Sequence, residues 1–242
     1  GVFYPPRPVV NFIVRGVDEI LRTEFGLPLG LADTSTWAQV VARNDRIKVP
    51  AHVKPDTPFV QILDPATGTG TFLVEVIDLI HQRMENHWKA EGKSDTEIKV
   101  AWNAYVPAHL LPRLTAFELM MAPYTIAHMK VGLKLSETGY NFGSDERARI
   151  FLSNALEPAH DLDGGFNFLS EALAHEAIAS NAAKSEAAFV VIVGNPPYAT
   201  LSSNGGAFIR GLMQDYKTSL GGEIQVQALS NDYAKFFRIA EY

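Results

Sequence analysis

The sequence contains no cysteine among its 242 residues, which excludes disulfide bonds and thiolate metal sites. It has no apolar run of the ~18 residues that a membrane-spanning helix needs, and its first residues do not form a signal peptide. Seven histidines are scattered without the spacing of a metal site, so we assign no metal ligand. We therefore expect a soluble, cytoplasmic domain, and its 47% hydrophobic residues are enough for a substantial core.

An excess of positive charge is also missing, because 27 acidic residues outnumber 21 lysines and arginines and leave a net charge of −6. A surface that binds nucleic acid is expected to attract phosphates. Such a contact would therefore depend on local cations or on other parts of a longer protein. Lys184, Arg210 and Lys217 are candidate local cations, and the alternative is that they are ordinary solvated side chains.

The most informative motif lies directly after an apolar run at residues 189–193. It consists of Asn195, Pro196, Pro197 and Tyr198. The β-branched run is typical of a central strand in a parallel sheet. Gly194 then lets the backbone turn at the carboxyl edge of the sheet, where open α/β folds bind their ligands. The alternative interpretation is a polar turn after a buried strand.

The chemistry of an exocyclic amine explains these residue types. The amine is a poor nucleophile because its lone pair is delocalised into the ring, and acceptors for both of its hydrogens would pull the nitrogen toward a tetrahedral shape. Asn195 offers a side-chain oxygen, and Pro196 offers a carbonyl that its locked φ holds in place. Tyr198 offers a flat face for a base rotated out of a duplex. Such a reaction depends on positioning and electrostatics and requires no covalent intermediate.

A second motif joins a short apolar strand at residues 60–63 to a helical pattern that starts at Thr71. It contains Asp64, Pro65, Ala66, Thr67, Gly68, Gly70 and Phe72. Its glycines let the backbone approach a ligand closely. No lysine follows Gly70, which excludes a Walker loop, and Leu73 replaces the third glycine of a dinucleotide fingerprint. Asp64 would also repel a pyrophosphate. The alternative is an ordinary glycine turn between a strand and a helix.

The N-terminal segment contains Phe3, Tyr4 and Pro6 and leads into a predicted helix over residues 8–21. Its apolar positions have helical spacing. They are Val9, Val10, Ile13, Val14, Val17, Ile20 and Leu21. The alternative to a role in binding is a helix that only packs against the rest of the domain.

Two further strands are predicted at residues 114–118 and 149–153. The first ends in Glu118, and a carboxylate in that position can accept both hydroxyls of a ribose. The second precedes Asn154, for which the alternative is an ordinary turn residue. Glu118 follows Asp64 at a distance well above the ~20 residues that are typical of nucleotide-binding folds. We therefore predict an extended helical connection that includes residues 81–99.

In this order, the motifs resemble those of the γ-order methyltransferases that modify adenine in DNA. The sequences at 24–33, 117–128 and 231–238 narrow the resemblance to the methylase region of Type ISP restriction–modification enzymes, and the likeness spans nearly the whole chain. Thr67 and Thr69 replace a cysteine and a serine of that family's loop. Pro5 replaces the threonine that is usual in its N-terminal segment.

The resemblance implies a Rossmann-like α/β sheet of S-adenosylmethionine-dependent methyltransferases, with helices on both faces. The implied reaction is methyl transfer from S-adenosylmethionine to N6 of a flipped-out adenine in double-stranded DNA, with catalysis by Asn195, Pro196, Pro197 and Tyr198. The implied cofactor-binding residues are Phe3, Tyr4, Pro6, Asp64, Pro65, Ala66, Thr67, Gly68, Gly70, Phe72, Glu118 and Asn154. Among them, Phe3 and Tyr4 would cover the methionine end and Asn154 would lie near the adenine ring. Methylation at carbon 5 of cytosine is excluded, since it requires a cysteine nucleophile.

We divide the chain into an N-terminal helical segment at residues 1–59, with the cofactor-covering motif, and a methyltransferase core at 60–242. A methyltransferase sheet needs further strands, so we expect the core to be incomplete at its C-terminus and one sheet edge to be open. The translocase, nuclease and target-recognition parts are expected in the same longer polypeptide. Within the core we predict a mobile loop over 199–222 and a helix over 225–241.

Two alternatives remain for the function. The same donor and motif would serve a methyltransferase that acts on a protein glutamine or on a guanine of ribosomal RNA. The Tyr4-containing segment and the long connection argue against it, and methylation of release factors without activity on duplex DNA would establish it. The other alternative is a non-catalytic module that binds the cofactor and senses methylation, and the intact Asn195 argues against this one.

Overall fold

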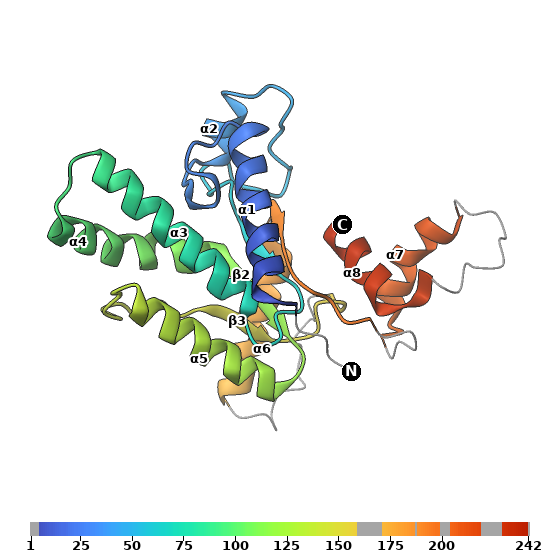
Figure 1. Ribbon diagram of the computed structural model, residues 1–242. Helices are drawn as coiled ribbons and strands as arrows, with labels where there is room; N and C mark the ends of the chain where they lie inside the picture. Colours follow the sequence, from blue (N-terminus) through green and yellow to red (C-terminus); the bar gives the residue numbers. More distant parts are fainter. Residues whose placement is uncertain (1–4, 159–170, 187, 199–203, 219–228, 242) are drawn as a thin grey trace.

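The computed structural model describes residues 5–158, 171–186, 188–198, 204–218 and 229–241 (Figure 1). The elements are α1 (Arg7–Thr23), η1 (Gly30–Ala32), α2 (Trp37–Val41), β1 (Ile62–Asp64), α3 (Thr71–Ala90), α4 (Asp95–Tyr105), η2 (Val106–Leu110), η3 (Leu111–Arg113), β2 (Leu114–Glu118), α5 (Met121–Glu137), β3 (Arg149–Leu152), α6 (Glu171–Glu186), β4 (Val191–Ile192), α7 (Ala207–Thr218) and α8 (Asp232–Glu241). None of the helices in these ranges is both long and apolar enough to cross a membrane.

The four strands form one parallel sheet in the order β3-β2-β1-β4. The chain runs outward from β1 through β2 to β3 and then returns to the other side of β1 at β4. This reversal creates a topological switch point between β1 and β4. Ligands of open α/β folds bind outside the carboxyl ends of the strands at such a point.

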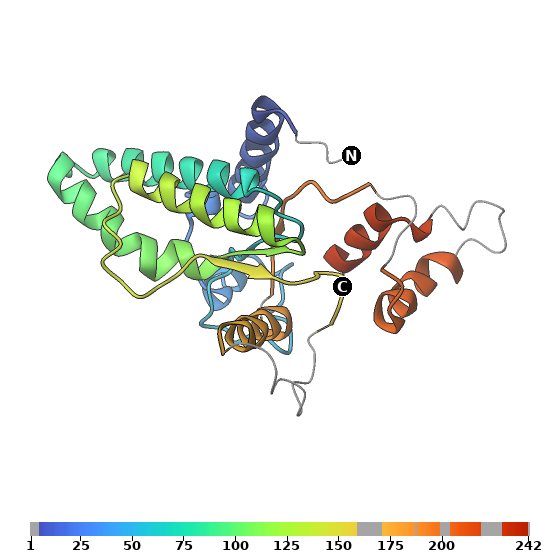
Figure 2. The ribbon, with the colours of Figure 1, turned by 90° about the horizontal axis from the view of Figure 1, so that it is seen from below.

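Helices cover both faces of the sheet, as the sequence predicts. Neighbouring strand residues alternate between the two faces. Ile62 and Ile150 join the large core under α1, α3 and α5, whereas Leu63 and Phe151 pack against Ala183 of α6. Figure 2 shows the same layers, with α3 and α5 on one side of β3 and α6 on the other. The predicted α/β fold class is therefore confirmed.

The strand predictions hold better for β2 than for β4. The predicted strand at residues 114–118 coincides with β2. The apolar run at residues 189–193 contains a strand of two residues, and β4 pairs only with β1 among the described residues, which corrects its predicted central position. The run is apolar although the strand pairs with only one neighbour, because helices bury it on both faces of the sheet. Val191 and Val193 lie in the large core, while Ile192 packs against the α6 side.

The helix predictions are mostly confirmed. The predicted helix over 8–21 is α1, but Val9, Ile13 and Ile20 of its apolar set are exposed. The long connection consists of α3 and α4. The predicted mobile loop over 199–222 is wrong in its middle part, where α7 forms an ordered helix. Residues 199–203 and 219–228 lie outside the described ranges, and the C-terminal helix begins at Asp232.

A buried arginine ties the N-terminal segment to the sheet. Arg113, only 2% exposed, donates hydrogen bonds to the carbonyls of His109, Asp33 and Val60. It also donates to the hydroxyl of Tyr105 at 2.9 Å. Buried polar groups are stable only when they find such partners. The network therefore fixes the chain that leads into β1.

Candidate functional site

The carboxyl ends of β1 and β4 meet at Asp64 and Gly194. A Cβ atom on Gly194 would lie 2.7 Å from Asp64 Oδ1 and 3.4 Å from Pro65 Cδ, so any larger residue would force the Asp64 carboxylate to move. The strands are held in register by the Val193 N–H, which donates to the Leu63 carbonyl at 2.9 Å. The glycine loop and the Asn195 motif thus converge at the switch point, as the sequence predicts.

The glycine loop lies directly against α5. Gly68 and Gly70 have φ values of 56° and 76°, in the left-handed region that favours glycine. A Cβ on Gly70 would lie 3.2 Å from Cα and Cβ of Ala127. Lys130, one turn further along α5, lies 3.4 Å from the hydroxyls of both Thr69 and Thr71. The glycine loop and the start of α3 therefore pack closely against α5.

Glu118 connects the glycine loop to the end of β2. Its carboxylate accepts hydrogen bonds from the N–H groups of Gly68 and Met120, both at 2.8 Å. The Thr67 N–H donates to the carbonyl of Phe117 at 3.0 Å. The carboxylate predicted to bind a ribose thus lies beside the predicted cofactor loop, where two backbone donors already orient it.

Asp64 is a buried acidic residue of the site whose pKa is strongly shifted. Its side chain is fully buried, and this burial raises its pKa from 3.8 to about 7, while the Ala66 N–H and the nearby Thr67 hydroxyl act in the opposite direction. The negative charge of Glu118 raises the pKa further. Asp64 Oδ2 has no hydrogen-bond partner within the described residues. A buried carboxyl group with a vacant acceptor fits a ligand that brings a donor or a positive charge.

Asn154 lies at the carboxyl end of β3 and is held by several partners. Its side-chain amide donates to Asn204 Oδ1 at 2.9 Å, and its Oδ1 accepts from the Leu156 N–H at 3.0 Å. Lys184 donates to the Asn154 carbonyl at 2.7 Å and lies over the ring of Phe117. Lys184 is therefore part of the packing of α6, neither a free cation for phosphate nor a solvated side chain.

The remaining predicted residues differ in their surroundings. Tyr198 is 61% exposed, whereas Phe72 is 4% exposed and belongs to the large core. Pro6 precedes α1 and its carbonyl accepts from the N–H groups at positions 9 and 10. Phe3 and Tyr4 lie outside the described residues. The structure brings Asp64, Gly68, Glu118 and the Asn195 motif to one edge.

Sequence analysis missed a buried carboxylate next to this edge. Glu75, in the second turn of α3, is 6% exposed and accepts hydrogen bonds from Arg7 and Asn11 of α1. The sequence feature that could have revealed Glu75 is a single acidic residue within the apolar pattern that follows Thr71. The contact holds the N-terminal part of α1 against the second turn of α3, the helix that follows the glycine loop.

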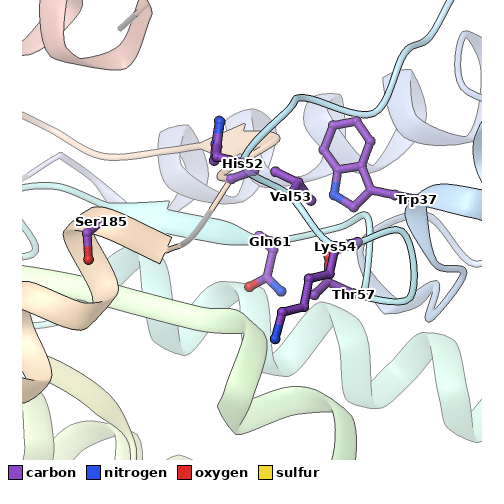
Figure 3. A pocket seen from close by; sticks show the side chains of 8 residues that line it. Trp37, His52, Val53, Lys54, Thr57, Gln61 and Ser185 are labelled. Atoms are coloured by element: carbon purple, nitrogen blue, oxygen red, sulfur yellow. Dashed lines mark hydrogen bonds between the residues drawn. The ribbon is translucent and has the colours of Figure 1, made fainter.

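A separate cavity lies at the opposite end of the strands. It has a volume of about 400 Å³ and is lined by Trp37, His52, Val53, Lys54, Thr57, Gln61, Ser185 and Ala188 (Figure 3). Gln61 and Ala188 come just before β1 and β4, so the cavity opens at their amino ends. Trp37 Nε1 is buried and has no hydrogen-bond partner within the described residues. No predicted site residue lines this cavity.

The chain has a Rossmann-like α/β fold, with one parallel sheet of four strands and helices on both of its faces. No protein-family model and no curated protein sequence matches it.

Three solved structures are similar to this chain. The chain is similar to the ATP-dependent Type ISP restriction-modification enzyme LlaBIII bound to DNA, with a TM-score of 0.66 and 22% identity over 99% of this chain and 14% of that one. A nuclease-deletion mutant of the Type ISP enzyme LlaGI, in complex with a DNA substrate mimic, has a TM-score of 0.66 and 23% identity over 99% of this chain and 17% of that one. A DrdV–DNA complex has a TM-score of 0.62 and 23% identity over 99% of this chain and 19% of that one. The chain thus spans less than a fifth of these proteins.

Proposed function

We propose that this chain transfers a methyl group from S-adenosylmethionine to the N6 amino group of adenine in DNA, as the modification part of a restriction–modification enzyme. The observation that carries this proposal is the convergence of two motifs at one switch point, where Gly194 contacts Asp64. A donor loop and an amine-holding motif are required side by side for such a transfer, and these segments lie 130 residues apart in sequence.

The residues of the glycine loop fit the cofactor. The vacant, buried oxygen of Asp64 suits a ligand with a positively charged or hydrogen-bond-donating group. Glu118 is oriented by two backbone donors and would accept the ribose hydroxyls. Phe3 and Tyr4 would cover the methionine end. The cofactor would supply a methyl group bonded to a positively charged sulfur.

The Asn195 motif would hold the amine. Asn195 Oδ1 and the Pro196 carbonyl would each accept one amine hydrogen, while Pro197 keeps the loop rigid and Tyr198 stacks on the flipped-out base. The amine nitrogen forms its bond to the methyl carbon as the bond from that carbon to sulfur breaks. The extra proton on nitrogen then leaves to water. Positioning would supply much of the rate enhancement.

The partners follow from the same proposal. DNA is the expected substrate, and the three similar structures were solved with DNA or a DNA mimic. We infer that translocase, nuclease and target-recognition parts belong to the same longer polypeptide. The net charge of −6 agrees with a fragment that leaves most phosphate contacts to those parts.

The test is methyl transfer from radiolabelled S-adenosylmethionine to unmethylated DNA, followed by analysis of the nucleosides. We expect N6-methyladenine, and we expect Asn195→Ala to lower the rate at least a hundredfold. Thermal stabilisation by S-adenosylmethionine, with NAD and ATP as controls, tests the cofactor separately, since a ligand at a hundred times its Kd adds ~2.7 kcal/mol. Labelled release factors without labelled DNA would support the protein-glutamine alternative. Unchanged methylation in Asn195→Ala would support the sensor alternative.

A further inference from the structure

Tyr198 belongs to an exposed row of three aromatic side chains beyond the carboxyl edge of the sheet. Its ring stacks on that of Tyr233, with centroids 5.1 Å apart and ring planes inclined by 18°. Tyr233 in turn meets Phe237 edge-on, at 4.8 Å and 61°. Tyr198 and Phe237 remain 61% and 51% exposed. A contiguous exposed patch of this kind marks a surface for a partner.

The helix that carries Tyr233 and Phe237 is fixed to the sheet. Phe236 of α8 is buried in a small core with Leu156, which follows β3. Lys235 donates to the carbonyl of Asn204, whose side chain bonds to Asn154 at 2.9 Å. In Figure 2 the arrow of β3 points toward α7 and α8. The aromatic row is therefore held in a defined place at the carboxyl edge.

A groove continues the row between α7 and α8. It has a volume of about 530 Å³ and is lined by Tyr216, Leu229, Asn231, Tyr233, Ala234 and Phe237. On α7, Arg210 and Lys217 form no ion pair within the described residues. Exposed aromatic side chains are a surface on which unstacked bases bind, and α7 contributes two cations to the same pair of helices.

We propose that this row is the base-stacking surface of the site and that Tyr233 is a positioning residue, which holds the ring of Tyr198 for a flipped-out adenine. The inference rests on the proposed function. Tyr233 covers one face of the Tyr198 ring and leaves that side chain largely exposed to a base. A ring that is supported before the base arrives loses less conformational freedom when the base binds.

The first experiment compares Tyr233→Ala with Tyr233→Phe, which keeps the ring. Phe142→Ala, at an exposed aromatic beyond the other end of α5, is the matched control. Methyl transfer to DNA gives kcat/KM for DNA and KM for S-adenosylmethionine. A base–aromatic stack strengthens binding by roughly five- to 150-fold, so we expect Tyr233→Ala to lower kcat/KM for DNA at least fivefold. Tyr233→Phe and Phe142→Ala should stay within twofold, with Tm and KM for S-adenosylmethionine unchanged.

A double-mutant cycle then tests whether Tyr233 acts through Tyr198. In the Tyr198→Ala background, Tyr233→Ala should have no further effect, because the ring that it supports is gone. An equal loss in both backgrounds, or no loss in either, would overturn this inference while methyl transfer by the unaltered protein left the proposed function standing. If the unaltered protein transferred no methyl group to any DNA, the proposed function would fall, and this inference with it.

Discussion

At the scale of single residues, the environment of Asp64 links the site to pH. Its pKa in the folded protein is about 7, above its ordinary value of 3.8, and burial is the main cause. Between these two pH values the folded chain holds a proton that the unfolded chain has lost. The contribution of Asp64 to stability is therefore fully present below about pH 4 and is lost as the pH rises through 7.

Asp64→Asn should remove this dependence. Relative to the unaltered protein, the variant should gain stability between pH 5 and pH 8, by at most roughly 4 kcal/mol, because an amide has no proton to lose. Urea unfolding at a series of pH values measures the difference. Asp56→Asn, at an exposed position in a turn, is the control. A difference between Asp64→Asn and the unaltered protein that does not change with pH would contradict the buried-carboxyl account.

At the scale of elements, α1 and α3 are joined by a polar contact as well as by apolar packing. Asn11 and Arg7 both donate to the carboxylate of Glu75, which is 6% exposed. Buried carboxylates are stable only with such donors. The contact joins the N-terminal part of α1 to the second turn of α3, the helix that follows the glycine loop.

Exchanging the two groups tests this contact. Asn11→Asp places a second carboxylate beside Glu75 and should destabilise the protein by about 1–3 kcal/mol. Combining it with Glu75→Gln restores one donor and one acceptor and should recover most of the loss. Urea unfolding gives the free energies, and titration with S-adenosylmethionine shows whether affinity follows them. Losses that simply add in the double variant would show that the contact contributes nothing.

Element prediction worked where one local pattern decided the outcome. The strand that ends at Glu118 and the glycine loop after Asp64 follow from apolar runs and from glycine chemistry. The helix α7 was missed because glycines precede it and serine and asparagine surround it, although Ile209 and Met213 have helical spacing and are buried. The Tyr198–Tyr233 stack depends on how α8 packs, which no local pattern encodes.

At the scale of the whole molecule, Arg113 connects segments that are far apart in sequence. It joins Asp33 of the N-terminal segment, Val60 before β1 and Tyr105 of α4. Sequence analysis did not single it out, because an arginine between two apolar stretches is typical of a turn. Its burial follows from the packing of three segments around it.

Arg113→Met should be strongly destabilising. The substitution keeps much of the side-chain length but leaves the carbonyls of Asp33 and Val60 without a donor, which should lower the free energy of unfolding by about 2–4 kcal/mol. Arg113→Lys should also destabilise, since an ammonium group cannot reproduce the planar set of donors. Thermal unfolding measures both, with exposed Arg43→Met as the control. Unchanged Tm in Arg113→Met would contradict this role.

The contact between Gly194 and Asp64 has an evolutionary consequence. A Cβ at position 194 would overlap the carboxylate at position 64, so position 194 is not free to take a larger residue while Asp64 is retained. Among homologous sequences, a larger residue at 194 should occur only together with a shorter side chain at 64. Positions 64 and 194 should therefore covary, even among homologues whose intervening helices differ in sequence.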